Sequence, residues 1–129
     1  MNDLARVQAP EDFRNAAGQL DPQRIGAHLE RLGQIFTDLQ HAAALLAKTE
    51  LSVLAALTLT ERDKIPRPSL AEARVRALAS DTYQDHVYAL TAARWKAEQA
   101  RVTYQAAQAM VEAARTAEVT RRAELHGRN

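Results

Sequence analysis

The stretch from Ser69 to Leu125 constrains this chain most, because it is long, rich in Ala and free of both Pro and Gly. Ala has the highest helix propensity, so the stretch predicts one very long helix. At 1.5 Å per residue, such a helix would be about 85 Å long. A helix of this length is stable only when an apolar stripe packs against a partner helix. The sequence therefore predicts a long helix with a partner.

The predicted partner is an earlier helix that begins at Asp21-Pro22, since Asp is a favoured N-cap and Pro suits the first helical position. Glu50 interrupts its apolar pattern, and we expect the helix to end near Thr60 or Arg62. Before Glu50, apolar residues recur at alternating steps of four and three, the heptad pattern of a coiled coil. This seam is Ile25, Leu29, Leu32, Phe36, Leu39, Ala43 and Leu46.

Two prolines separate the two helices. Ile65 and Arg67 each precede a proline, which disfavours the helical conformation at both positions. Ser69 to Glu72 then match the S-x-x-E capping box, which marks the start of the second helix. We expect Gly127 to end that helix. Its four-and-three spacing predicts a packing stripe of Tyr88, Ala92, Trp95, Gln99, Val102, Ala106, Ala109, Ala113 and Ala117.

These elements predict an all-α fold built as a long antiparallel helical hairpin with a coiled-coil-like seam. The hairpin domain is 21–129, with a helix at about 21–62, a turn at 63–68 and a helix at about 69–125. Two helices alone bury too little apolar surface to be stable. We therefore expect a homo-oligomer, in which several hairpins form a helical bundle or ring.

Residues 1–20 are predicted to form a short N-terminal arm. Pro10 would start a short helix that Gly18 ends, and Phe13 and Leu20 are among its apolar anchors. Two outcomes stay open, because the arm either packs on a neighbouring element or is partly disordered. The acidic start of the chain predicts no signal peptide. Without 18 consecutive apolar residues, no membrane span and no membrane partner are expected.

Catalytic and metal-binding chemistry finds little support in the sequence. The chain has no Cys, which excludes disulfides and thiolate sites and fits a cytoplasmic setting. Asp38 and His41 have a spacing used in di-iron bundles, but Leu39 on the seam turns both away from it. We find no nucleophile elbow or phosphate loop. We therefore predict a protein that is not an enzyme and has no metal, cofactor or small-molecule substrate.

Cations gather around the predicted turn. Residues 1–61 carry a net charge of −3 and residues 62–129 carry +4, within a total of +1. If several hairpins lie side by side, the cations of each turn form a row that can follow a phosphate backbone. The simpler alternative is a solvated, charged loop. The candidate nucleic-acid contacts are Arg62, Lys64, Arg67, Arg74 and Arg76.

Residues 61–122 (ERDKIPRPSLAEARVRALASDTYQDHVYALTAARWKAEQARVTYQAAQAMVEAARTAEVTRR) resemble phage-encoded helical-hairpin proteins of the recombination-mediator, UvsY-like type. The shared features are a basic, proline-broken turn and a long Ala-rich helix with Tyr and Arg. The resemblance implies a ring of hairpins that binds single-stranded DNA and helps to load a recombinase, in the cytoplasm of a bacterial host. It assigns the family's basic turn to Lys64, Arg67, Arg74 and Arg76.

Two functions therefore stay open. The first is an oligomeric, non-catalytic accessory factor of recombination or replication that binds single-stranded nucleic acid. The second is a structural or protein-interaction coiled coil, such as a virion component, a scaffold or a secreted hairpin, that binds no nucleic acid. Convergence of the basic residues in the assembly favours the first function, and scattering favours the second.

Overall fold

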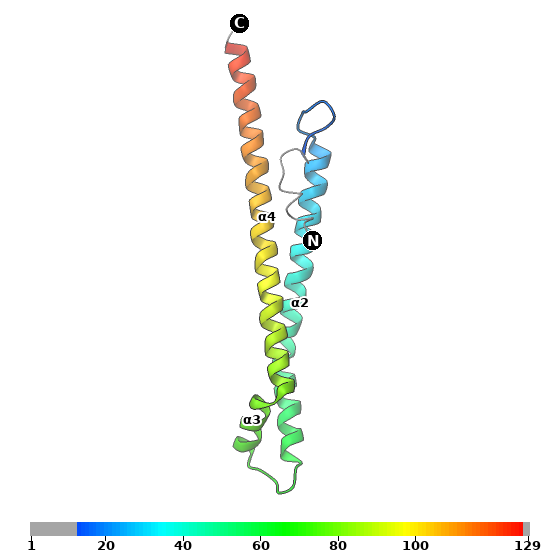
Figure 1. Ribbon diagram of the computed structural model, residues 1–129, viewed down its shortest axis with the longest axis vertical. Helices are drawn as coiled ribbons and strands as arrows, with labels where there is room; N and C mark the ends of the chain where they lie inside the picture. The colour runs from blue at the N-terminus through cyan, green and yellow to red at the C-terminus, as the bar shows by residue number, and fades with distance from the viewer. Residues whose placement is uncertain (1–12, 128–129) are drawn as a thin grey trace. The chain divides into compact units, whose positions relative to one another are not determined.

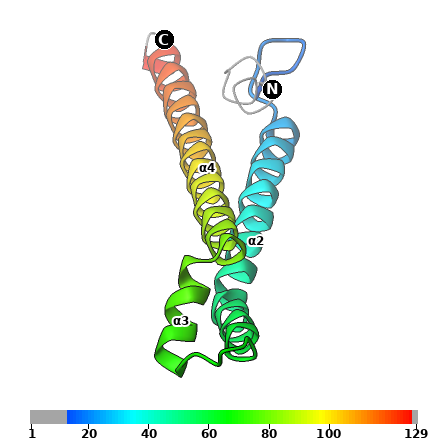
Figure 2. The ribbon, with the colours of Figure 1, turned by 60° about the horizontal axis from the view of Figure 1, so that its bottom comes forward.

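The computed structural model describes residues 13–127, and within them the fold is all-α. Three helices follow one another along the chain: α2 (Pro22–Arg62), α3 (Leu70–Ala79) and α4 (Asp81–Gly127). The two long helices, α2 and α4, pack antiparallel (Figures 1 and 2). The predicted helical hairpin is therefore confirmed, and the first helix has the expected bounds.

The prediction of one helix over 69–125 is wrong, because Ser80 divides the stretch into α3 and α4. Ser80 is extended, with φ −68° and ψ 147°. Its hydroxyl donates to the carbonyl of Ala77 at 2.6 Å and accepts from the Tyr83 amide at 3.2 Å. One serine thus caps the end of α3 and the start of α4. The capping box at Ser69 is confirmed, since its Oγ accepts from the Glu72 amide.

The chain divides into two compact units. Unit 1 is Met1–Thr37 with Glu98–Asn129, and unit 2 is Asp38–Ala97. In each unit one segment of α2 packs against one segment of α4, and unit 2 also contains α3. The two units are built differently.

Unit 1 has a true apolar core, in which Phe13, Ile25 and Val111 are buried against one another. Phe13 is only 1% exposed and its ring meets that of His28 edge to face. Phe13 and Leu20 of the predicted arm therefore pack on the helices, while residues 16–19 are exposed and residues 1–12 lie outside the described part. Val119, further along α4, is exposed.

A second cluster in unit 1 joins Leu32 and Ala107, with Leu29 and Tyr104 packed beside them. The Tyr104 ring lies 3.4 Å from where a Cβ on Gly33 would be. The missing side chain of Gly33 thus leaves room for this ring. Ala107 is fully buried, so α2 and α4 approach closely here because one of the facing residues is small.

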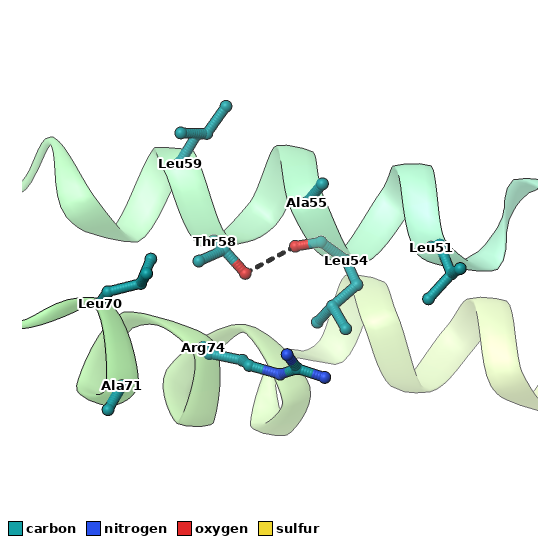
Figure 3. A pocket seen from close by; sticks show the side chains of 8 residues that line it. All are labelled: Leu51, Leu54, Ala55, Thr58, Leu59, Leu70, Ala71 and Arg74. Atoms are coloured by element: carbon teal, nitrogen blue, oxygen red, sulfur yellow. Dashed lines mark hydrogen bonds between the residues drawn. The ribbon is translucent and has the colours of Figure 1, made fainter.

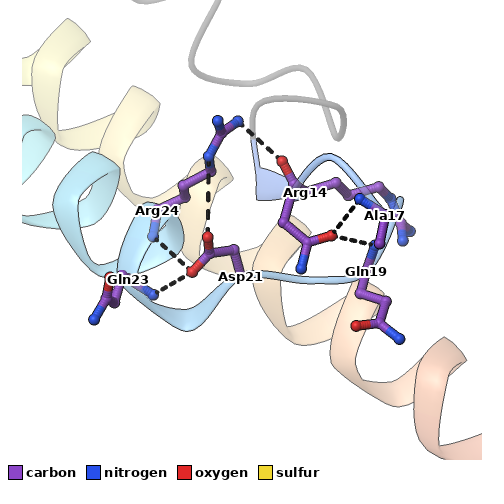
Figure 4. A network of polar contacts seen from close by, with 7 residues as sticks. Arg14, Ala17, Gln19, Asp21, Gln23 and Arg24 are labelled. Carbon is purple, nitrogen blue, oxygen red and sulfur yellow. Dashed lines mark hydrogen bonds and ion pairs between the residues drawn. The ribbon is translucent and has the colours of Figure 1, made fainter.

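A tight loop joins Phe13 to α2 (Figure 4), so the expected short helix does not extend to Gly18, and its first residues, 10–12, lie outside the described part. Asn15 Oδ1 accepts hydrogen bonds from the amides of Ala17 and Gln19, at 2.9 and 3.1 Å. Gly18 has φ +76°, a left-handed conformation that glycine adopts without strain. The predicted N-cap of α2 is confirmed, because Asp21 Oδ1 accepts from the Gln23 amide at 3.0 Å.

The predicted packing stripe of α4 is wrong. Tyr88 is 77% exposed, Trp95 63% and Val102 52%, whereas Leu90 and Ala97, which follow Tyr88 and Trp95 by two positions, are buried. Two positions along a helix correspond to a rotation of about 200°, so α4 buries the opposite face. The cause is visible in the sequence, because both faces repeat small or apolar residues at four-and-three spacing. The buried row is Leu90, Ala97, Ala100, Ala107 and Val111.

Phe13→Ala tests the attachment of the arm to unit 1. Because the ring is buried with Ile25 and Val111, its removal should lower the free energy of unfolding by about 3 kcal/mol. Urea unfolding followed by circular dichroism measures this change. Val119→Ala removes an exposed side chain from the same unit and should change stability by less than about 0.5 kcal/mol. Equal losses of stability in the two variants would contradict the packing of the arm.

Candidate interaction surfaces

Unit 2 holds its helices together partly through polar contacts. The Tyr83 hydroxyl on α4 donates to Glu50 Oε1 on α2 at 2.9 Å. One turn further along α4, His86 Nε2 lies 3.0 Å from the carbonyl oxygen of Leu46. Glu50 interrupts the predicted seam, and in the structure its carboxylate accepts the hydrogen bond from Tyr83. The hydrogen bond to Glu50, followed by burial, raises the pKa of Tyr83 above its ordinary 10.0.

The apolar interior of unit 2 is made largely of small side chains. Ala43, Ala73, Ala77 and Ala97 are buried there, with Leu54 and Leu90 as larger members. Both clusters of mutually packed buried residues in the described part of the chain lie in unit 1. Small side chains fill little volume, so unit 2 buries little apolar surface for its length.

Large apolar side chains instead lie on the outside of unit 2. Within residues 13–127, twelve large apolar residues are exposed, and nine of them belong to this unit. Exposed apolar side chains in such number are typical of a protein-interaction site. The nine residues are Leu45, Leu51, Leu59, Ile65, Leu70, Val75, Leu78, Tyr88 and Trp95.

An open apolar groove of about 750 Å³ lies between α2 and α3 (Figure 3). The Thr58 hydroxyl in this groove donates to the Leu54 carbonyl at 2.7 Å, so it presents little polarity to an occupant. Arg74 is the charged side chain among the lining residues. The groove is lined by Leu51, Leu54, Ala55, Thr58, Leu59, Leu70, Ala71 and Arg74.

The five predicted nucleic-acid contacts, here called the basic segment, all lie in unit 2. Arg62 is the last residue of α2, Lys64 and Arg67 belong to the connection, and Arg74 and Arg76 belong to α3. All are exposed except Arg62, which is half-buried. The structure thus places them on three successive elements, and Arg74 lines the apolar groove.

Ion pairing distinguishes Lys64 from the four arginines of the basic segment. Lys64 Nζ contacts Glu61 Oε1 at 2.7 Å, an i,i+3 pair that neutralises its charge locally. The four arginines of the segment make no ion pair with any residue in 13–127. These four guanidinium groups remain available to an anionic partner.

The C-terminal cations of α4 behave differently. Arg121 donates to Glu118 at 2.7 Å, and Arg122 lies 3.8 Å from the same carboxylate. The hydrogen bond from Arg121 lowers the pKa of Glu118. This local pairing neutralises part of the positive charge at the C-terminal end of α4, and Arg128 lies outside the described residues.

The predicted packing stripe of α4 forms an exposed row, which we call the outer face. It is free of charge over its whole length, because each of its nine members is apolar or, in Gln99, neutral. Every member except the half-buried Ala92 is exposed. The outer face consists of Tyr88, Ala92, Trp95, Gln99, Val102, Ala106, Ala109, Ala113 and Ala117. The sequence identified this row, but the prediction that it packs against the partner helix α2 is wrong.

Two further kinds of site concern metal ions and membranes. Within residues 13–127, no group of three or more His, Cys, Asp or Glu residues is placed to hold a metal ion. By length and composition alone, α2 is the described helix that qualifies as a possible membrane span. Its Lys48 and Glu50 fall within the most apolar part, and Glu50 is bonded to Tyr83. The absence of a membrane partner stays a prediction.

Comparisons with known proteins add no relationship to this picture. A scan of protein-family models, a search of curated proteins and a search of solved structures each found no match. The fold and its surfaces therefore define the class as far as an all-α helical hairpin. Function has to be inferred from the surfaces alone.

The hydrogen bond from Tyr83 to Glu50 predicts that the stability of unit 2 depends on pH. Because the bond raises the folded-state pKa of Tyr83, its contribution to stability is complete below pH 10.0 and is lost as the pH rises through the raised value. Absorbance titration of phenolate should show a component that ionises late. Tyr83→Phe should remove that component and Tyr88→Phe should retain it. Loss of the late component in Tyr88→Phe would contradict the assignment.

Proposed function

We propose that this chain is a non-catalytic helical assembly protein, which works by associating with further copies of itself into a larger helical bundle. The observation that carries the proposal is the inverted construction of unit 2. Its interior is built mainly of alanines, while nine large apolar side chains lie on its surface. Association would cover this surface and add the apolar burial that the hairpin lacks.

The groove between α2 and α3 supports this function. A groove between two helices accepts the apolar face of a third helix, as in helix-in-groove recognition. Leu51 and Leu59 on α2 are strongly exposed at the groove, so their burial by a partner would be the most favourable. In the assembly, helices of neighbouring copies would occupy this groove.

Leu51→Lys with Leu59→Lys tests the assembly. Each leucine buried on association contributes about 1.5 kcal/mol, so the double variant should weaken formation of the largest species by about 100-fold. Sedimentation across a range of concentrations measures the effect. Ser52→Lys with Thr60→Lys adds the same charge at exposed positions of α2 that do not line the groove, and should change little. A wild-type chain that stays monomeric at every concentration would refute the proposed function.

A second candidate function is the binding of single-stranded nucleic acid by the basic segment, as an accessory to recombination or replication. The observation that favours it is that four arginines, all between positions 62 and 76, make no ion pair in the described part of the chain. Assembly would repeat these charges in every copy and so multiply the phosphate contacts. The UvsY-like resemblance points to the same activity.

Arg62→Glu with Arg67→Glu tests the second candidate. Binding of a fluorescent single-stranded oligonucleotide should weaken at least tenfold, and the slope of its salt dependence should become shallower by about 0.7 for each phosphate that the variant no longer binds. Arg31→Glu with Arg94→Glu is the matched control, because it makes the same charge change at exposed positions outside the basic segment. An equal decrease in affinity for both variants would indicate attraction by net charge and exclude a site at the basic segment.

A further inference from the structure

We propose that two copies of this chain pair antiparallel through the outer face of α4, with the two-fold axis beside Val102. The inference rests on the proposed function, since it names the surface, orientation and centre of one interface in the assembly. The first observation behind it is the sustained pattern. α4 is uninterrupted from Asp81 to Gly127, and its outer face keeps heptad spacing for about four heptads. A pattern of that length is typical of a coiled-coil contact with another long helix.

The distribution of side-chain size along the outer face favours a second copy in the antiparallel orientation. Its large residues, Tyr88 and Trp95, precede Val102, and only alanines follow it. Trp95 and Ala109 each lie one heptad from Val102, so antiparallel pairing sets Trp95 of each copy against Ala109 of the other. Tyr88 likewise meets the alanines near the end of the row. Large residues then fill the space left by small ones along the whole contact.

A parallel pair fits poorly by the same criterion. It would oppose Trp95 to Trp95 and hold the helices apart there, while Ala109 and Ala113 of the two copies would face each other across a gap. A gap of this kind loses van der Waals interactions along its lining. The outer face is thus self-complementary only when one copy is reversed, which is the symmetry of an isologous dimer.

Charge gives an independent argument for the same orientation. Asp85 and Arg121 lie on the same flank of the outer face, on opposite sides of Val102 and at nearly equal sequence distances from it. Antiparallel pairing brings Asp85 of each copy within a turn of Arg121 of the other. Asp85 makes no ion pair within residues 13–127, and it would join the pair that Arg121 forms with Glu118. A parallel pair would leave Asp85 and Arg121 at opposite ends of the contact, where they cannot interact.

Single cysteines test the pairing, because the chain has none of its own. In the antiparallel dimer Val102 lies beside its own symmetry mate, so Val102→Cys should form a disulfide-linked dimer under mild oxidation. Ala109→Cys alone should not, since the two sulfurs would be about 21 Å apart along the helices. A mixture of Trp95→Cys and Ala109→Cys chains should cross-link to each other. Self-linking of Ala109→Cys would indicate parallel pairing and overturn the proposal.

Trp95 supplies a second readout, as the only tryptophan in the chain. Its side chain is 63% exposed in the single chain, so dimerisation should move its emission to shorter wavelength as the concentration rises. Val102→Lys places a charge at the centre of the contact and should abolish the shift. Gln108→Lys adds the same charge at an exposed position outside the outer face and should preserve it. A shift that survives Val102→Lys would overturn the proposal.

The groove variant separates this inference from the proposed function. In the Leu51→Lys, Leu59→Lys background the Val102→Cys cross-link should persist, because these leucines lie on α2. If the wild-type chain associates but Val102→Cys does not cross-link, the α4 pairing is wrong and the proposed assembly stands. If the wild-type chain is monomeric at every concentration and Val102→Cys does not cross-link, both are wrong.

Discussion

The close contact of α4 with α2 depends on alanine. Small side chains at Ala97, Ala100 and Ala107 let the two helices approach, but each contributes little apolar burial. A pair of helices whose contact is filled mainly by alanine needs larger groups elsewhere to be stable. The two units meet this requirement differently. This difference explains why unit 1 has a covered apolar core, whereas unit 2 exposes many large apolar side chains.

In unit 1 the larger groups come from the chain itself. Phe13 closes over Ile25 and Val111, and the loop that carries it is fixed by Asn15 and by the Asp21 cap. In unit 2 the short helix α3 contributes buried Ala73 and Ala77 and leaves its leucines outside. Polar bonds from Tyr83 and His86 hold the pair together there, and the apolar surface that remains is the basis for assembly.

Two errors of the sequence-based prediction concern α4, namely where it begins and which of its faces is buried. Ser80 lies in a run of good helix formers, and its capping of two helices at once is visible only when the chain turns there. The choice of the buried face failed for another reason. Trp95 and Tyr88 were predicted to be buried because they belong to a row with four-and-three spacing, yet α2 packs against the opposite face, which has the same spacing and buries Leu90, Ala97 and Val111.

The sequence by itself determined the all-α class, the start of α2 at its Asp21 cap, the break at the prolines and the start of α3 at Ser69, because these depend on local backbone preferences. It also predicted the seam of α2, whose seven members are all buried or half-buried. Only the tertiary structure decided which face of α4 is buried, what Phe13 covers and how Glu50 is paired. Each of these depends on which residues of two distant segments fit together, and helical periodicity alone holds no information about that fit.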